Sequence, residues 1–325
     1  MHRVYQLGNP IPDSLAPGIE ALLNDANAHL EQVAAHTEAD LIRICSDAVG
    51  LIPMGAEPIT EHVMRSLPNL RVVARGGVGV DTVDIAAATE LGIQVTNAPD
   101  TNYQDVAVHT LAMIMHLLRR IGEFDDRVRR GQWTHPRYAS ILQRPHAMQL
   151  GIIGFGRSGQ ELARLASTVG FRIATHVRPG REDAAAAAGA TPLSLDELLS
   201  TSDIVSLHIG LDQHTKEIID TSALARFKKG AVLVNVSRGG LIDEAALIAA
   251  LNAGHLAGAA LDVFAHEPLP TDDPLLAAPN TVLTPHIAYL SAQSLLDATA
   301  TTVSDVVRVL QDRTPKYPVN TPNSN

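Results

Sequence analysis

The sequence contains very little of several things, and each scarcity excludes a class of protein. Its 325 residues include one cysteine, Cys45, so no intrachain disulfide can form, and a lone thiol more often fills a core position than reacts. No stretch approaches the roughly 20 apolar residues that a membrane-spanning helix needs. Lysine and arginine total 25 against 35 acidic residues, and this net charge of -10 argues against a protein that binds nucleic acid electrostatically.

The N-terminal sequence does not predict a secretory signal peptide. Residues 1–13 contain no apolar segment of the kind found in a secretory signal peptide, so we expect a cytoplasmic protein with no membrane partner. Hydrophobic residues (46%) and charged residues (18%) are in the usual proportion for a globular α/β protein, and the length favours two domains. We predict no metal site.

The most informative stretch is residues 149–159, with the sequence QLGIIGFGRSG. A short apolar run predicts a buried parallel strand, a GxGxxG turn follows at once, and a helical pattern comes next. Gly154 permits a tight turn, Gly156 lets backbone N–H groups approach a pyrophosphate, and Gly159 lets the helix pack closely on the strand. The N-terminus of that helix adds a partial positive charge. We therefore expect a dinucleotide to be held by Gly154, Phe155, Gly156, Arg157, Ser158 and Gly159.

Strand and helix signals alternate on both sides of this turn. The predicted strands cover residues 3–7, 41–45, 70–74, 93–96, 150–153, 171–177, 203–209, 231–236, 259–263 and 281–283. The predicted helices cover residues 19–30, 61–67, 82–91, 105–121, 160–169, 194–200, 243–252 and 291–312. This alternation predicts an α/β protein with two Rossmann-like, doubly wound parallel-sheet domains.

Two neighbouring segments have contrasting patterns. Residues 105–121 are apolar on nearly all sides, so this predicted helix is expected to be buried either inside one chain or in an interface between subunits. Residues 122–146 are polar and are expected to form a long connection.

The cofactor preference is expected to be set just after the second strand of the dinucleotide fold. Proteins of this kind that prefer NAD usually have Asp or Glu about 20 residues beyond the glycines. Here that position is Val177, and the next residue is Arg178. A carboxylate accepts a hydrogen bond from the ribose 2′-hydroxyl, whereas a guanidinium can hold a 2′-phosphate. The sequence predicts NAD(P) with a leaning toward NADP; that Arg178 is an ordinary solvated loop residue stays open.

Three ionisable residues, Arg238, Glu267 and His286, come just after the last three strong strand predictions. Because the carboxyl ends of parallel strands meet at one edge of the sheet, we expect these side chains to lie close together. Histidine can exchange a proton near neutral pH, a carboxylate can orient it, and arginine can bind an anion. A lone histidine after a strand is more often structural, so the hypothesis depends on the combination of all three.

At this point the chain resembles the D-isomer-specific 2-hydroxyacid dehydrogenase family. The matching motifs are GGVGVD at 76–81, LGIIGFG at 150–156, NVSRGG at 235–240, LDVFAHEP at 261–268 and TPHI at 284–287. The resemblance implies His286 as the acid/base, Glu267 as its partner and Arg238 as the ligand of the substrate's oxygen atoms. It implies backbone contacts to the substrate carboxylate from Gly77, Val78 and Gly79. The further cofactor residues would be Val177, Arg178, His208, Val236, Ser237 and Asp262, the last of them meeting the nicotinamide amide.

The resemblance also implies a domain plan. A discontinuous substrate domain would combine residues 1–98 with a C-terminal helix and tail at 291–325, and residues 99–290 would form the dinucleotide domain. The family is usually dimeric, so a homodimer through the helix at 105–121 is expected. Three positions depart from the family pattern: Val108 replaces a common glutamate, His208-Ile-Gly210 replaces HxP, and Tyr289 replaces a common glycine.

The predicted activity is reversible hydride transfer between a nicotinamide cofactor and a D-2-hydroxy acid, with the substrate acid and the physiological direction left open. Two alternatives are kept. A formate dehydrogenase resembles this fold, but Glu267 argues against it because those enzymes have glutamine at the matching place. A nucleotide-sensing binding protein, like the corepressors that resemble this family, would retain the same three residues, although the low basicity argues against it.

Overall fold

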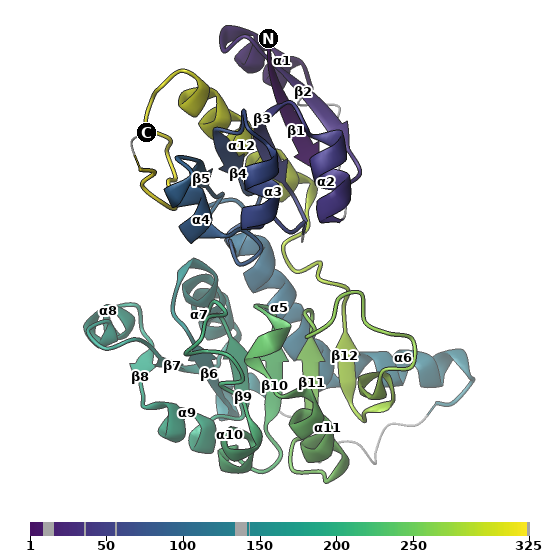
Figure 1. The fold of residues 1–325 in the computed structure, drawn as a ribbon. Coiled ribbons are helices and arrows are strands. Elements are labelled where there is room, and N and C mark those ends of the chain that lie inside the picture. The colour runs from purple at the N-terminus through teal and green to yellow at the C-terminus, as the bar shows by residue number, and fades with distance from the viewer. Residues whose placement is uncertain (9–15, 36, 56, 134–141, 143, 324–325) are drawn as a thin grey trace. The chain divides into compact units, whose positions relative to one another are not determined.

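The computed structural model describes residues 1–8, 16–35, 37–55, 57–133, 142 and 144–323. The chain folds into two compact units (Figure 1): residues 1–102 with 290–325 form the first unit, and residues 103–289 form the second. The first unit is therefore assembled from two separate stretches of chain. Each unit is built on a parallel sheet with helices, so the predicted fold class is confirmed.

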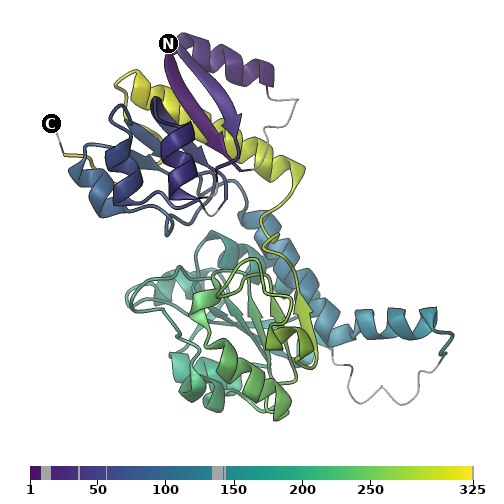
Figure 2. The same ribbon diagram turned by 45° about the vertical axis from the view of Figure 1, so that its right-hand side comes forward.

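The first unit contains a five-stranded parallel sheet in the order β2-β1-β3-β4-β5. Its strands are β1 His2–Leu7, β2 Ala28–Val33, β3 Ala48–Pro53, β4 Val72–Ala74 and β5 Gln94–Thr96. Its helices are α1 Ala16–Asp25, α2 Glu38–Ile44, α3 Glu61–Ser66, α4 Ile85–Glu90 and α12 Ala292–Leu310. In Figure 2, α12 (yellow) lies against strands from the start of the chain. Buried Val303 and Val306 of α12 pack there with Ile52 and Val72.

The start of the first unit differs from the sequence prediction. The predicted strand at 41–45 is helix α2, and the end of the predicted helix at 19–30 belongs to strand β2. The apolar run beginning at Leu41 fits a strand as well as a helix, but Thr37 accepts a hydrogen bond from the Asp40 N–H and so starts the helix. Strand β3, which follows, was not predicted.

The second unit contains a seven-stranded parallel sheet in the order β12-β11-β10-β9-β6-β7-β8. Its strands are β6 Gln149–Ile153, β7 Arg172–His176, β8 Thr191–Pro192, β9 Ile204–Leu207, β10 Val232–Asn235, β11 Gly258–Leu261 and β12 Thr281–Leu283. Its helices are α5 Tyr103–Arg119, α6 Ile121–Arg129, α7 Arg157–Val169, α8 Glu182–Ala187, α9 Leu195–Thr201, α10 Thr221–Arg226 and α11 Glu244–Asn252. The chain runs from β6 to β7 on one side and returns to β9 on the other, and ligands bind at such a switch point in open α/β sheets.

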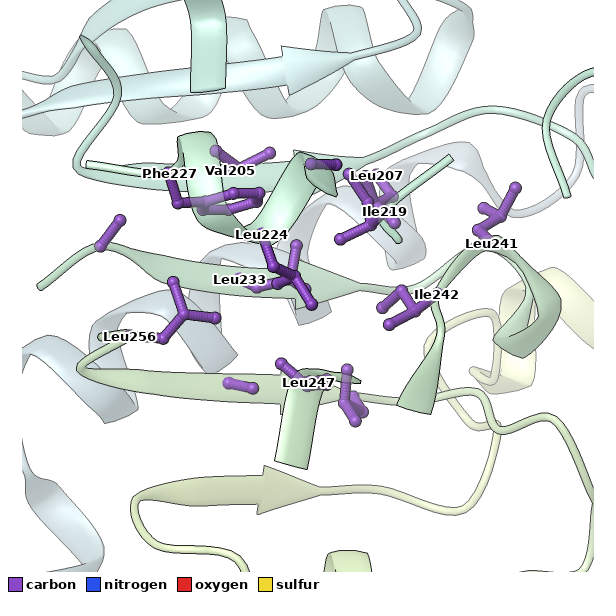
Figure 3. Packing of buried hydrophobic residues seen from close by; sticks show 14 of the residues in the cluster. Val205, Leu207, Ile219, Leu224, Phe227, Leu233, Leu241, Ile242, Leu247 and Leu256 are labelled. Carbon is purple, nitrogen blue, oxygen red and sulfur yellow. The ribbon is translucent and has the colours of Figure 1, made fainter. Parts of the chain in front are cut away.

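The sheet of the second unit is buried on both faces, which explains why its strands read as continuous apolar runs. All four residues of β9, β10 and β11 are buried. Figure 3 shows one face, where Leu233 of β10 packs among residues such as Leu224 of α10 and Leu247 of α11. On the other face, Ile114 of α5 and Leu162 of α7 belong to a second core. The two cores hold the sheet from both faces, and so they fix the carboxyl ends of its strands, where the candidate site residues follow.

The segment after α5, predicted as the start of a long polar connection, is a helix. Helix α5 ends at Arg119, Arg120 adopts a left-handed conformation (φ 51°), and residues 121–129 form α6. Helix α6 is polar, and pairs such as Arg127–Glu123 and Arg129–Asp125 lie four residues apart on it. Such pairs stabilise the polar side of a solvent-exposed helix, while Ile121 and Val128 of α6 are exposed apolar residues. The remainder of the predicted connection lies largely outside the described residues.

Two kinds of feature are absent from the part of the chain that the structure describes. None of its helices is both long enough and apolar enough to cross a membrane. No group of three or more His, Cys, Asp or Glu side chains within it is arranged to hold a metal ion.

Candidate active site and dinucleotide loop

The turn between β6 and α7 requires glycine at the positions that the sequence singled out. Gly154 has φ +90°, and a Cβ placed on it would lie 2.5 Å from the carbonyl oxygen of His208. A Cβ on Gly159 would lie 2.6 Å from the carbonyl oxygen of Gly154. A side chain at either position would force the loop and the helix apart, so these glycines set the close approach of α7 to the sheet.

The outer side of the same turn is open. Gly156 is the N-cap of α7, and a Cβ placed on it would meet nothing within 4 Å. The first turn of a helix presents backbone N–H groups and a partial positive charge, which together favour a phosphate. The residues present therefore fit the pyrophosphate of a dinucleotide, with the backbone of the turn as its holder.

A buried histidine supports the start of α7. His208 Nδ1 lies 3.1 Å from Ser158 Oγ, and His208 Nε2 lies 3.0 Å from Ser206 Oγ of β9. Burial lowers the pKa of His208 to about 4, so its ring is neutral at physiological pH. A neutral ring between two hydroxyl groups can fix the orientation of Ser158, one of the predicted cofactor residues, without adding a charge.

The position predicted to read the ribose lies just beyond β7. Val177 is half-buried, whereas the Arg178 side chain is exposed, and the Arg178 carbonyl accepts a hydrogen bond from the Arg181 N–H (3.2 Å). The loop thus places a guanidinium, and no carboxylate, directly after the strand. This arrangement is compatible with a 2′-phosphate.

The structure brings His286 and Glu267 together. His286 Nδ1 and Glu267 Oε2 are 2.6 Å apart, with the two side chains 39% and 32% exposed. The second oxygen, Glu267 Oε1, accepts a hydrogen bond from the Phe264 N–H (2.9 Å). Because Nδ1 is engaged by the carboxylate, Nε2 is the ring nitrogen that can exchange a proton with a ligand.

The ionisation of Glu267 fits this pairing. Burial opposes the charged form, but the hydrogen bonds from His286 and the Phe264 N–H, with the nearby charges of His286 and Arg238, outweigh it and lower the pKa of the Glu267 carboxyl. A carboxylate that stays ionised can hold a histidine in one orientation and stabilise its protonated form.

Arg238 follows β10 in a tightly held turn. Asn235 spans this turn, because its Nδ2 donates to the Arg238 carbonyl (2.8 Å) and its Oδ1 accepts from the Ser237 N–H (3.0 Å). The next residue, Gly239, touches the loop after β11: a Cβ on it would lie 1.9 Å from the carbonyl carbon of Phe264. The loops that carry Arg238 and Glu267 are therefore packed directly against each other.

Asp262 holds the loop of His286, a role that the sequence did not suggest. Its side chain is fully buried, and its two oxygens accept from the Thr284 hydroxyl (2.6 Å), the Ile287 N–H (2.9 Å) and the Ala288 N–H (2.8 Å). The His286 N–H donates to the Asp262 carbonyl (2.8 Å). His286 itself has a left-handed conformation (φ 54°), which is uncommon for a residue other than glycine.

The glycine loop of the first unit, described by itself, has ordered peptides. The Gly77 carbonyl accepts from the Ala98 N–H (3.0 Å), and the Val78 carbonyl accepts from Asn97 Nδ2 (2.8 Å). Because C=O and N–H point in opposite directions across a trans peptide, the N–H groups of Val78 and Gly79 are directed away from these partners. That orientation is suited to binding an anion.

The chain is similar to known proteins along almost its whole length. The family model described as "D-isomer specific 2-hydroxyacid dehydrogenase, NAD binding domain" matches residues 111–288. A D-3-phosphoglycerate dehydrogenase from Mycobacterium tuberculosis is 36% identical over 302 residues, which cover 92% of this chain and 56% of that protein. A glyoxylate reductase from Korarchaeum cryptofilum is 39% identical over 280 residues, which cover 82% of this chain and 84% of that protein.

A solved structure of an acyclic imino acid reductase in complex with NADPH and D-Arg superposes with a TM-score of 0.88 at 25% identity. The alignment covers 98% of this chain and 100% of that chain. The chain spans about half the length of the phosphoglycerate dehydrogenases that it matches.

Proposed function

Because the chain belongs to the D-isomer-specific 2-hydroxyacid dehydrogenase family, we propose that it transfers hydride reversibly between a nicotinamide cofactor and a D-2-hydroxy acid/2-oxo acid pair. The observation that carries the proposal is the 2.6 Å hydrogen bond between His286 and Glu267, whose loop packs on that of Arg238. This reaction requires an acid/base, a carboxylate that keeps the acid/base oriented, and a cation that binds the anionic substrate.

The bound nicotinamide supplies or accepts the hydride. In the oxidation, Nε2 of His286 accepts the proton of the substrate hydroxyl as hydride leaves C2. In the reduction, protonated His286 donates that proton to the oxygen on which negative charge develops. Arg238 would bind the substrate's oxygen atoms and so orient C2 for the hydride. Binding of the substrate carboxylate by the N–H groups at Gly77, Val78 and Gly79 stays a prediction from the sequence resemblance.

The residues that would hold the cofactor are those predicted from the sequence. The turn of Gly154, Gly156 and Gly159 would bind the pyrophosphate, aided by the first turn of α7. We propose NADPH as the preferred cofactor, because Arg178 follows β7 where a carboxylate would favour NADH. The similar imino acid reductase was solved in complex with NADPH, so a protein of this fold can bind the phosphorylated cofactor.

The proposed function is tested by mixing the enzyme with NADPH or NADH and a panel of glyoxylate, hydroxypyruvate, pyruvate and bulkier 2-oxo acids. We expect oxidation of the cofactor with at least one of these acids. NADPH binding without turnover across the panel would favour the alternative of a nucleotide-sensing binding protein. A parallel assay with formate and the oxidised cofactor tests the other alternative, and turnover in that assay alone would favour a formate dehydrogenase.

Assembly of two subunits is proposed from exposed apolar side chains on α5 and α6. Val108 is 58% exposed, Ile121 is 52% exposed and Val128 is 53% exposed, although the rest of α5 contributes to the core. We predict a homodimer, with twice the 34.6 kDa mass of one chain by light scattering. Val108→Lys should weaken the association, whereas Val169→Lys, at an exposed apolar position on α7, is the matched control. A stable monomer at micromolar concentration would contradict the prediction.

A further inference from the structure

We propose that His109 of α5 is a positioning residue for the proton transfer, acting through Thr284 and Asp262 on the loop that carries His286. The inference rests on the proposed function for its chemistry, but the hydrogen-bonded chain is present in the structure independently of it. These hydrogen bonds join His109 to Thr284 and Thr284 to Asp262, and His109 and Thr284 are 175 positions apart in sequence.

The protons of this chain can be placed. Thr284 Oγ1 donates its single proton to Asp262 Oδ1 at 2.6 Å, so its oxygen is left to accept. His109 Nε2 lies 3.1 Å from that oxygen and 3.7 Å from Asp262 Oδ1. We therefore infer that Nε2 carries the proton and donates to Thr284. The His109 side chain is 23% exposed, and the Asp262 side chain is not exposed at all.

The row of hydrogen bonds from His109 reaches the loop of His286 at the carboxylate of Asp262. This carboxylate accepts the N–H groups of Ile287 and Ala288, immediately after His286, while the Asp262 carbonyl accepts the N–H of His286 itself. These bonds hold the segment in which His286 has its left-handed conformation. Thr284 is the only side chain among the described contacts that donates to this buried carboxylate, and His109 orients Thr284.

Helix α5 gives His109 a rigid base. Thr110, Met113 and Ile114 on the same helix are buried, and α5 contacts β10, β11 and β12. Through its contact with Thr284, the histidine thus attaches the loop after β12 to a helix that is packed in the core. Without it, we expect Thr284 to rotate, the loop to gain freedom and the short contact between His286 and Glu267 to be made less often.

The experiment compares His109→Phe, which keeps a flat aromatic ring but removes the N–H, with Thr284→Val, which removes the hydroxyl. Thr284→Ser restores the hydroxyl, and His116→Phe is the control, because His116 is a half-buried histidine two turns further along α5. For each variant we measure kcat, the dissociation constant of NADPH and the pH titration of the Glu267 carboxyl. The titration is followed by carbon-13 NMR, and the signal of Glu267 is assigned as the one that is missing in Glu267→Gln.

His109→Phe and Thr284→Val should each lower kcat by at least about tenfold, a part of the roughly 10²- to 10⁴-fold that a general acid/base contributes, with the dissociation constant of NADPH unchanged. The Glu267 carboxyl should titrate at higher pH in both variants, because the His286 hydrogen bond that lowers its pKa is made less often. Thr284→Ser should retain more activity than Thr284→Val, and the effects of His109→Phe and Thr284→Val should not add.

A lower melting temperature with unchanged kcat and unchanged Glu267 titration would overturn the inference, because it would show a purely structural role. Equal effects of His116→Phe would overturn it as well. If the wild-type protein turned over no acid in the panel, the proposed function would fail, whereas the NMR titration would still decide whether His109 positions the His286–Glu267 pair.

Discussion

Replacing His286 with alanine should lower kcat by about 10²- to 10⁴-fold, the range that general acid/base catalysis contributes. The substitution removes the proposed acid/base, the histidine that Glu267 contacts at 2.6 Å. It leaves the dinucleotide turn after β6 untouched. The measurement is steady-state reduction of the best 2-oxo acid, with the dissociation constant of NADPH determined in parallel.

The control for this substitution is His62→Ala, which removes an exposed histidine from α3 of the first unit. It should leave kcat and cofactor affinity as they are. Near-normal turnover by His286→Ala would show that another group moves the proton. Equal losses of turnover and of NADPH binding would show instead that His286 supports the fold of the site.

Replacing Arg178 with alanine should lower the preference for NADPH over NADH. A charge-assisted hydrogen bond contributes roughly 1.5–3 kcal/mol, which corresponds to about 10- to 150-fold in affinity. The physical ground is that Val177 carries no charge to repel a 2′-phosphate and the exposed Arg178 guanidinium can bind it. The measurement is kcat/KM for both cofactors in the wild type and in the variant.

The matched control is Arg172→Ala, an exposed arginine at the opposite end of the same strand, β7. It should leave the ratio of the two cofactors unchanged. A wild-type enzyme that strongly prefers NADH would contradict the assignment of Arg178. So would a variant whose ratio equals that of the wild type.

Most strands of the second unit and its helices α5, α7, α9 and α11 were predictable from the sequence because local signals and global packing agree there, whereas α6, α10 and β8 were not predicted. Ser194 and Glu197 form the expected capping box at the start of α9, and Asp243 caps α11. The two-sided burial of the sheet makes each strand an apolar run, and the glycine turn fixes where the first of them ends. In the first unit, the run beginning at Leu41 fits either element, and only the Thr37 cap decides for a helix.

The residues proposed for the chemistry could be picked out from the sequence, but the hydrogen bonds that support their loops could not. Arg238, Glu267 and His286 stand out because each is an ionisable residue placed just after a predicted strand. The hydrogen bond of His109 to Thr284 has no such signal, since it joins a helix to a loop 175 residues away. Sequence patterns report which side chains face one side of an element, whereas this contact depends on how two elements pack.

We propose that hydride passes directly from the nicotinamide to C2 of a 2-oxo acid while His286 supplies the proton. The most direct measurement is reduction of the best 2-oxo acid other than glyoxylate in ordinary water with NADPH that carries two deuterium atoms at C4, followed by mass spectrometry and chiral separation of the product. We predict a D-2-hydroxy acid with one deuterium at C2. A product with only solvent hydrogen at C2, or one of L configuration, would contradict the account.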